Sequence, residues 1–270
     1  MQDSLSQFII WTSEAKLQNC HPSGGWDLWL KYQKLRWIPA SCPPSLCEGK
    51  CRRDAGMTDT FELRMKVLIG TPIHESKDYC MQRWLENVAN LQKESPANLL
   101  LVDNSPDTKY MKKMKGYCNK IGLTDYRIEH ITLPPEQKNF ERLARSREII
   151  RQYVLKNEYD AWFSWESDQI IPTHALGTLV KIIQSGNFMI VSHNNWTRQN
   201  PDMPNFDFGV SLITRKALEK YRFVLKFGTD PDMPDTYEPS EAWFRKQVIR
   251  GGDSFLEIDG ILKPIYHLDR

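Results

Sequence analysis

Two acidic side chains lie two residues apart in the middle of the chain. Glu166 and Asp168 follow an apolar run at 161–165 (AWFSW) and precede a short apolar segment that ends at Pro172. Side chains two apart in an extended segment point the same way, and paired carboxylates are good ligands for a hard divalent cation. Such a cation can bridge a substrate diphosphate. An acidic pair alone is more often a solvated turn, but its place at the end of a buried strand favours a ligand site.

Further side chains near the carboxyl end of the chain can do acid–base or metal chemistry. Glu241 opens a predicted helix ahead of Trp243 and Phe244, and Glu238 lies three residues earlier. A carboxylate there can act as a general base, although an acid in the first turn also simply favours the helix dipole. His267 lies near the last residue, where an imidazole is packed, solvated or a metal ligand. Glu241 and His267 are therefore candidates for a base and a ligand.

The segments that must position these residues alternate between strand-like and helix-like patterns over 66–192. Short apolar runs predict strands, and apolar residues at helical spacing predict the helices between them. The predicted strands are 66–70, 98–102, 126–131, 160–165 and 188–191, and the predicted helices are 76–92, 108–120, 139–156 and 173–184. This order favours a mostly parallel sheet with helices on both faces, whose ligands bind beyond the carboxyl ends of the strands. Those ends carry Thr71, Pro72 and Asp103 as well as the acidic pair.

The alternation breaks after Ser192. Two polar stretches, 193–207 and 226–238, have the length of loops that are usually functional or disordered. Around them the pattern predicts a strand at 208–214, helices at 215–221 and 239–250, and closing strands at 255–258 and 262–266. We expect these later segments to complete the same domain.

The first 56 residues differ from the rest. They hold four of the six cysteines and little periodicity, with short helices expected at 3–17 and 26–37. These cysteines are Cys20, Cys42, Cys47 and Cys51. Their spacing is not that of a standard zinc site, so reduced thiols are favoured over bound zinc. We expect an N-terminal appendage of uncertain order at 1–56 and a single α/β domain at 57–270.

Composition and charge exclude several classes of protein. Apolar residues make up 40% and charged residues 26% of the 270 residues, as in ordinary globular domains, which excludes disordered and coiled-coil chains. A net charge of +2 gives no reason to expect a nucleic-acid or membrane-surface protein. No apolar run approaches the roughly 18–20 residues that span a bilayer, and no signal-peptide pattern opens the chain. A cytoplasmic location is the resulting expectation.

Several segments, in order along 66–270, resemble the GT-A glycosyltransferases, particularly the family 2-like enzymes. KVLIGTPIHES resembles their first strand and donor-binding turn, LLLVDNSPD their second strand, and RLARSREIIRQYVL the helix before their Asp-X-Asp strand. YDAWFSWESDQIIP resembles that strand, FDFGVSLITRKALEK the acceptor-side strand, SEAWFRKQVIRGG the base-bearing helix and YHLD the closing His. The resemblance implies a GT-A fold, with a Rossmann-like, mostly parallel sheet flanked by helices. It also implies a glycosyltransferase of hexosyltransferase type that uses a nucleotide-sugar.

Position by position, the resemblance implies a donor site. Thr71 and Pro72 would line the base and ribose, and Asp103 would hydrogen-bond one of them. Arg145 would lie near the nucleotide, at or beside the diphosphate, and Glu166 would contact the ribose. The donor nucleotide stays open among UDP, GDP and dTDP.

The resemblance also implies a metal and a base. Asp168 would ligate Mn²⁺ or Mg²⁺, and His267 would complete the metal site. Glu241 would accept the proton of the acceptor and, from the opposite face of the sugar, would invert the anomeric centre. The sequence departs from the family at two places, because Glu166 stands where Asp is usual and Ser240-Glu241 stands where Glu-Asp is usual.

The polar loop after the fifth predicted strand offers candidates for the acceptor. Trp196 can stack on a sugar while Asn194 binds its hydroxyls, or both belong to an ordinary polar loop. Asp207 precedes Gly209, where a backbone without a side chain can approach a ligand, and a β-bulge is the alternative. The acceptor stays open among a glycan, a lipid, a protein and a modified nucleobase.

Two rival functions remain at this stage. A nucleotidyltransferase on a similar sheet would usually show a Gly-rich, basic loop after the first strand, and GTPIHESKD has one Gly and one Lys. A non-catalytic nucleotide- or carbohydrate-binding module would fit the two departures from the family pattern. A test of nucleotide-sugar hydrolysis separates an enzyme from a binding module.

Overall fold

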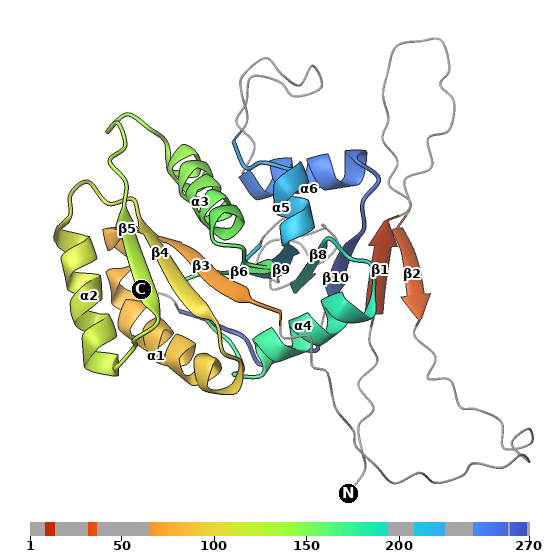
Figure 1. Cartoon of the computed structure of the whole chain (residues 1–270), viewed down its shortest axis with the longest axis horizontal. Helices are drawn as coiled ribbons and strands as arrows, with labels where there is room; N and C mark the ends of the chain where they lie inside the picture. Colours follow the sequence, from red (N-terminus) through yellow and green to blue (C-terminus); the bar gives the residue numbers. More distant parts are fainter. Residues whose placement is uncertain are drawn as a thin grey trace, which may run out of the picture.

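The computed structural model describes residues 65–193, 208–224, 240–258 and 260–268, together with the backbone of 9–13 and 32–36. Within these residues, helices cover both faces of an open sheet (Figure 1). The helices are α1 (Asp78–Glu94), α2 (Lys109–Ile121), α3 (Asn139–Lys156), α4 (Ala175–Ser185), α5 (Arg215–Lys220) and α6 (Ser240–Arg250). A 3-10 turn, η1 (Glu75–Lys77), leads into α1.

Nine strands of the described residues form the main sheet in the order β2-β1-β10-β8-β9-β6-β3-β4-β5. Their bounds are β1 (Ile9–Ser13), β2 (Tyr32–Arg36), β3 (Val67–Ile73), β4 (Asn98–Asp103), β5 (Tyr126–His130), β6 (Ala161–Trp165), β8 (Ile190–His193), β9 (Val210–Thr214) and β10 (Phe255–Ile258). β3 pairs in parallel with β4 and β6, and β4 with β5. β9 runs antiparallel between β6 and β8. The mostly parallel α/β sheet predicted from the sequence is thus confirmed.

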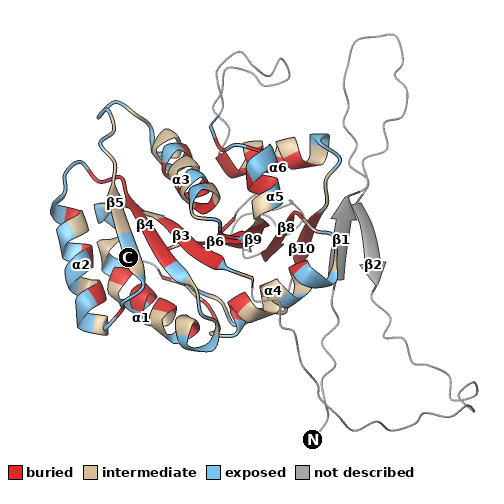
Figure 2. Ribbon diagram, viewed as in Figure 1, coloured by how far each residue is buried: buried red, intermediate tan, exposed pale blue. Residues whose placement is uncertain are grey.

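Alternate residues of the central strands pack on opposite faces of the sheet. On one face, Ile69 and Leu101 belong to an apolar cluster with α1, α2 and α4. On the other face, Leu68 and Leu100 pack with α3, α5 and α6. This alternation follows from the two-residue period of a strand and makes the sheet the buried middle layer (Figure 2). Because both faces are covered, ligands can reach the strands only at their ends.

The N-terminal segments are strands where we expected helices. β1 pairs antiparallel with β10 and with β2, so both extend the edge of the main sheet. The sequence of β1, IIWTS, is rich in β-branched and aromatic residues, which suit a strand beside an open edge. The four cysteines of 1–56 lie outside the described residues. The boundary at residue 56 stays a prediction.

A two-stranded sheet closes the described chain. β7 (Gln169–Ile170) pairs antiparallel with β11 (Tyr266–His267). The sequence predicted a strand at 262–266, but only the last of these residues is in a strand. Pro264 has no N–H to donate to a ladder, and the pairing begins after it. This small sheet brings the end of the described chain beside the acidic pair.

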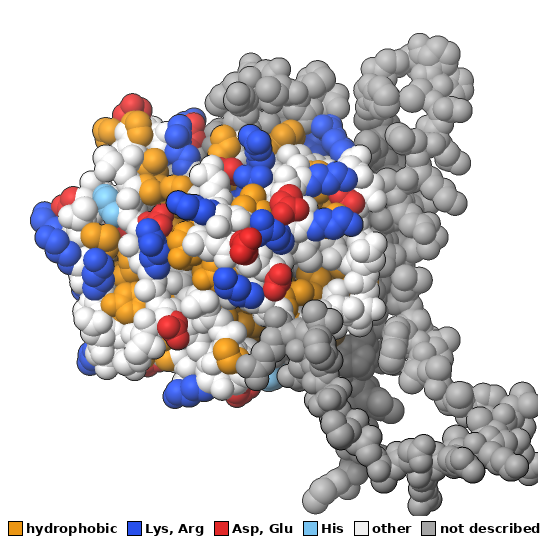
Figure 3. All heavy atoms as spheres, in the orientation of Figure 1, with side chains coloured by type: hydrophobic (Ala, Val, Ile, Leu, Met, Phe, Trp, Pro, Cys, Tyr) orange, Lys and Arg blue, Asp and Glu red, His pale blue; other side chains and the backbone are white. Residues whose placement is uncertain are grey.

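On the face shown in Figure 3, Lys and Arg side chains are spread among Asp and Glu rather than gathered into one basic patch. Among the described residues, no helix has both the length and the apolar character needed to cross a membrane.

Candidate active site

A cleft of about 640 Å³ lies at the carboxyl ends of β3 and β6, below α3 and the start of α6. We call it the carboxyl-end cleft. It is lined by Thr71, Pro72, Ile73, His74, Ser76, Lys77, Asn104, Asn139, Arg142, Leu143, Arg147, Ser164, Trp165, Glu166, Ser167, Asp168, Glu241 and His267. It therefore joins segments that are up to about 200 residues apart in the chain.

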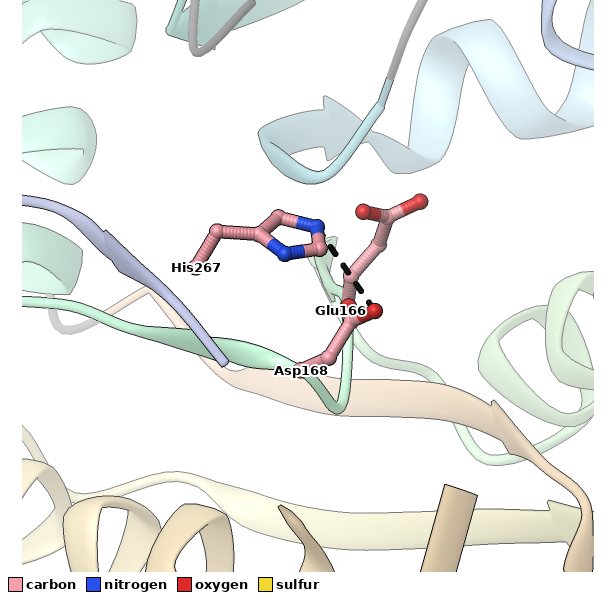
Figure 4. A group of neighbouring side chains, drawn as sticks. All are labelled: Glu166, Asp168 and His267. Atoms are coloured by element: carbon pink, nitrogen blue, oxygen red, sulfur yellow. Dashed lines mark ion pairs between the residues drawn. The ribbon is translucent and has the colours of Figure 1, made fainter. Parts of the chain in front are cut away.

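The acidic pair and the closing histidine form one group in this cleft. Ligand atoms of Glu166, Asp168 and His267 all lie within 4.8 Å of one another. Nε2 of His267 lies 3.6 Å from Oδ2 of Asp168, with the carboxylate of Glu166 alongside (Figure 4). The small β7–β11 sheet fixes this arrangement, because His267 pairs with Gln169 and the Leu268 amide donates to the Asp168 carbonyl at 2.7 Å.

The donor set of this group fits a hard divalent cation. Two carboxylates and an imidazole suit Mn²⁺, and carboxylates alone suit Mg²⁺. Asp168 is 4% exposed, so its charge needs a cationic partner in the folded protein. The backbone amide of Glu166 donates to the carbonyl of Gly209 at 2.9 Å, and its carboxylate accepts from Gln169 at 2.9 Å. Glu166 is thus held in place beside Asp168.

Lys77 is the cation that contacts Asp168 in this structure. Its Nζ forms an ion pair with Oδ2, the oxygen that also faces His267. Burial lowers the pKa of Lys77, but the hydrogen bond to Asp168 and its charge raise the pKa above the usual value. Lys77 is consequently an ammonium at neutral pH. Reasoning from the sequence missed this residue, since nothing in its spacing relates it to Asp168, 91 positions later.

A second charged group lies across the cleft, where α3 meets α6. The carboxylate of Glu241, in the first turn of α6, forms an ion pair with Arg147 of α3. Arg147 also donates to Ser240 Oγ at 2.7 Å, and Ser240 donates to Glu241 at 3.4 Å. Arg147 is 5% exposed, and its Nε has no hydrogen-bond partner among the described residues. This guanidinium orients the Glu241 carboxylate in the cleft.

The end of β3 forms the floor of the cleft. Thr71 is buried, and its hydroxyl donates to the carbonyl of Trp165 at 2.7 Å, which ties β3 to β6. Pro72 is partly exposed and lines the cleft. The His74 side chain caps η1 by accepting from the Ser76 amide at 3.1 Å. Burial lowers the pKa of His74, against the opposing charge of Glu75, so the imidazole is neutral at pH 7.

Asp103 lies behind the cleft rather than on its wall. Its carboxylate is fully buried, accepts from the Ser105 amide at 3.0 Å and lies 3.1 Å from Nδ1 of His130. The next residue, Asn104, lines the cleft, and its amide donates to Ser146 of α3 at 3.0 Å. Asp103 therefore shapes the turn that presents Asn104, a residue that our site prediction left out.

Arginines of α3 reach the cleft, but Arg145 is not among them. Arg145 is exposed on the helix, whereas Arg142 and Arg147 line the cleft. Arg145 and Arg147 are two positions apart, and side chains two apart on a helix project to different sides of it. A motif match therefore fixes the helix more securely than the side chain that reaches a ligand. Arg142 is held by the carbonyl of Gln137 at 3.1 Å.

Most of the proposed acceptor residues lie outside the described residues, namely Asn194, Trp196 and Asp207. Gly209 is buried, and its backbone carbonyl holds the amide of Glu166. The structure therefore gives Gly209 a part in positioning the acidic pair.

Comparisons with known proteins agree with the fold. No protein-family model matches the chain, and no curated protein matches its sequence. Among solved structures, the mannosyltransferase PcManGT from Pyrobaculum calidifontis, in complex with GDP-Man and Mn²⁺, matches with a TM-score of 0.53 at 13% identity, over 74% of this chain and 57% of its own. TarS 1–349 of S. aureus, in complex with UDP-GlcNAc, matches with a TM-score of 0.51 at 12% identity, over 76% of this chain and 59% of its own.

The chain spans less than two thirds of the length of each of these two proteins. Identities of 12–13% establish a shared fold and leave activity to be argued from the site itself. The described part of the chain has the GT-A fold of these glycosyltransferases, as the resemblance of its sequence segments implied.

Proposed function

We propose that this chain is a glycosyltransferase that moves a sugar from a nucleotide-sugar donor to an acceptor hydroxyl, with Glu241 as the general base. One observation carries the proposal. A single cleft at the carboxyl ends of the strands joins the group of Glu166, Asp168 and His267 with an arginine-held carboxylate, Glu241. A sugar transfer requires these two elements, a place for the leaving diphosphate and a base for the acceptor.

The donor would occupy the end of β3 and the turn after β4. Pro72, His74 and Asn104 line this part of the cleft and offer a flat surface and polar groups for a base and ribose. Arg142 and Arg147 supply positive charge from α3, as a diphosphate requires. The PcManGT and TarS structures contain GDP-Man and UDP-GlcNAc, which supports nucleotide-sugars as the donor class.

Glu166, Asp168 and His267 would hold the divalent cation. When bound, Mn²⁺ or Mg²⁺ offsets the negative charge of the departing nucleoside diphosphate. The carboxylate–imidazole donor set and the Mn²⁺ in the PcManGT complex favour manganese.

Glu241 would take the proton of the acceptor hydroxyl as that oxygen attacks the anomeric carbon. Arg147 and Ser240 fix the carboxylate, so its remaining lone pairs can be aimed at the acceptor. A base on the face of the sugar opposite the leaving diphosphate gives inversion. The acceptor class is not assigned by the described residues.

A thermal-shift panel tests the donor site. UDP-, GDP- and dTDP-sugars are each added with and without Mn²⁺, and the midpoint of unfolding is measured. A ligand at about 100 times its Kd stabilises by about 2.7 kcal/mol, which is roughly 5–10 °C for a domain of this size. We expect a metal-dependent shift with at least one donor, followed by slow release of free sugar.

Two outcomes would contradict the proposal. If no donor shifts the midpoint, the cleft is not a nucleotide-sugar site. If a donor binds but neither hydrolysis nor transfer occurs with any acceptor class, the chain is a binding module.

A further inference from the structure

The ion pair between Lys77 and Asp168 lies inside the proposed metal group. Nζ of Lys77 contacts the same Asp168 oxygen, Oδ2, that faces Nε2 of His267 at 3.6 Å. A hard cation on that oxygen would lie about 2.0–2.6 Å from it. An ammonium and a divalent cation cannot both take this oxygen at contact distance without strong repulsion between like charges.

Asp168 compensates in part for the position of Lys77 in the fold. Lys77 is the residue before α1, where the helix dipole is positive and disfavours a cation. Asp78, the first residue of α1, is already paired with Lys113 at 2.6 Å. The contact with Asp168 therefore offsets part of this cost, and solvent reaches the Lys77 side chain, which is 42% exposed.

The two partners differ in their freedom to move. The side chain of Asp168 is 5% exposed, whereas that of Lys77 is 42% exposed. Lysine has a long flexible stem, so Lys77 can leave the pair towards the open part of the cleft at little cost, while Asp168 stays in place. This asymmetry is the one expected of a displaceable counter-ion beside a fixed ligand.

We propose that Lys77 is a built-in counter-cation that neutralises Asp168 when no metal is bound and that an incoming divalent cation must displace. The inference rests on the proposed function, because it concerns the same metal group. The proposal has two consequences. First, Lys77 lowers the affinity of the site for metal alone. Second, displaced Lys77 brings a free positive charge into the cleft, where it can contact the diphosphate of the donor. Metal and donor binding are thereby favoured together over metal alone.

Calorimetric titration of Mn²⁺ alone tests the first consequence, with Lys77→Met as the variant. Met keeps the length of the stem without charge or an oxygen that could ligate the ion. In wild type, Mn²⁺ must displace the charge-assisted hydrogen bond between Lys77 and Asp168. The variant lacks this bond, so its affinity for Mn²⁺ should be about 10-fold higher or more. Lys77→Arg keeps the charge and should stay near wild type. Lys220→Met removes the lysine–aspartate pair with Asp253, at 2.8 Å and away from the cleft, and should leave Mn²⁺ affinity unchanged.

Titration of UDP and GDP at saturating Mn²⁺ tests the second consequence. Here Lys77→Met should lower the affinity for the nucleoside diphosphate. The same variant is therefore expected to bind metal alone more tightly and nucleotide less tightly. An unchanged or weaker Mn²⁺ affinity in Lys77→Met, with wild type still binding nucleotide in a metal-dependent way, would overturn the inference and leave the proposed function standing. Metal-independent nucleotide binding that is lost in Lys77→Met would also overturn it, because Lys77 would then replace the metal. If wild type binds none of UDP, GDP and dTDP under any condition, the proposed function itself fails.

Discussion

Two cavities of similar volume lie at opposite ends of the parallel strands. The carboxyl-end cleft measures about 640 Å³, and a cavity at the starts of β3, β4 and β5 measures about 710 Å³. We call the second the amino-end cavity. It is lined by Lys66, Val67, Glu86, Ala89, Asn90, Gln92, Lys93, Pro96, Ala97, Asn98, Ile121, Gly122, Leu123, Thr124 and Asp125.

The two cavities differ in how their charged residues are held. In the amino-end cavity Lys66, Glu86, Lys93 and Asp125 are all exposed, and the buried lining residues are apolar. In the carboxyl-end cleft Asp168, Glu241 and Arg147 are buried. Burying a charge is costly, so buried charges that line an open cleft point to a use for them. Volume alone would have favoured the amino-end cavity over the site that we propose.

The largest expected effect is on catalysis at the carboxyl end. Glu241→Gln keeps the shape of the side chain but removes the base, so sugar transfer should fall by about 10²–10⁴-fold. Glu86→Gln makes the same change in the amino-end cavity and should leave the rate unchanged. Transfer or donor hydrolysis is the measurement. A near wild-type rate in Glu241→Gln would assign the base to another acid and weaken the contrast between the two ends.

The next effect is on stability. Arg147→Met leaves the Glu241 carboxylate buried without its partner, which should lower the free energy of unfolding by about 3–5 kcal/mol. Arg127→Met removes an exposed pair with Glu129 on β5 and should cost only about 0–1 kcal/mol. Denaturant unfolding of both variants gives the comparison. An equal loss of unfolding free energy in the two variants would mean that the ion pair in the cleft stabilises the fold no more than the exposed pair does.

Chemical labelling of two thiols tests whether the apolar packing near the carboxyl-end cleft differs from that near the amino-end cavity. Cys80 lies at the start of α1 beside Lys77, and Cys118 lies in the last turns of α2 near the amino-end cavity. Burial raises the pKa of each thiol to about 11, with the charge of Asp168 adding to the effect at Cys80. At pH 8 both should react with iodoacetamide on the order of 10²-fold more slowly than an unperturbed thiol. Peptide mapping by mass spectrometry gives the labelling rate of each thiol. Fast labelling of only one of them would mean that the apolar packing around that thiol is looser than around the other.

The smallest effect is expected from shortening the chain. Both cavities are lined by residues that follow Met65. A chain that begins at Met57 lacks β1 and β2 but keeps every lining residue, so it should unfold cooperatively and keep its nucleotide affinity. Calorimetric unfolding with and without nucleotide checks this. Loss of a cooperative transition would make 1–56 part of the core rather than an appendage.

The elements that depend on local patterns were predictable from the sequence. The predicted helix at 139–156 has the same bounds as α3, and the predicted strand at 255–258 coincides with β10. Apolar residues at helical spacing and short buried runs carry this information, because it is contained within a few turns of chain. The acidic pair and His267, which the family resemblance singled out, lie together in the structure, and their part in binding a metal stays a prediction.

Contacts between distant segments were not predictable in this way. The pair of Lys77 with Asp168 and that of Arg147 with Glu241 join residues about 90 positions apart, and no local pattern marks them. Arg145 was predicted near the nucleotide, but it is exposed on α3, and Arg142 and Arg147 line the cleft. A motif does not say which face of α3 meets the cleft, so a role of Arg145 at the nucleotide stays a prediction. The strands β1 and β2 depend on the edge of β10, which lies more than 200 residues away.

Metal-dependent nucleotide binding in two matched variants tests the central claim most directly. Asp168→Asn and Asp125→Asn each remove one carboxylate charge, the first from the carboxyl-end cleft and the second from the amino-end cavity. Calorimetric titration of UDP or GDP, with and without Mn²⁺, should show that Asp168→Asn abolishes the metal-dependent part of the affinity and that Asp125→Asn leaves it unchanged. His267→Ala should weaken it less, because water can replace one neutral ligand. Unchanged metal-dependent binding in Asp168→Asn would contradict the account and remove the acidic pair from the site.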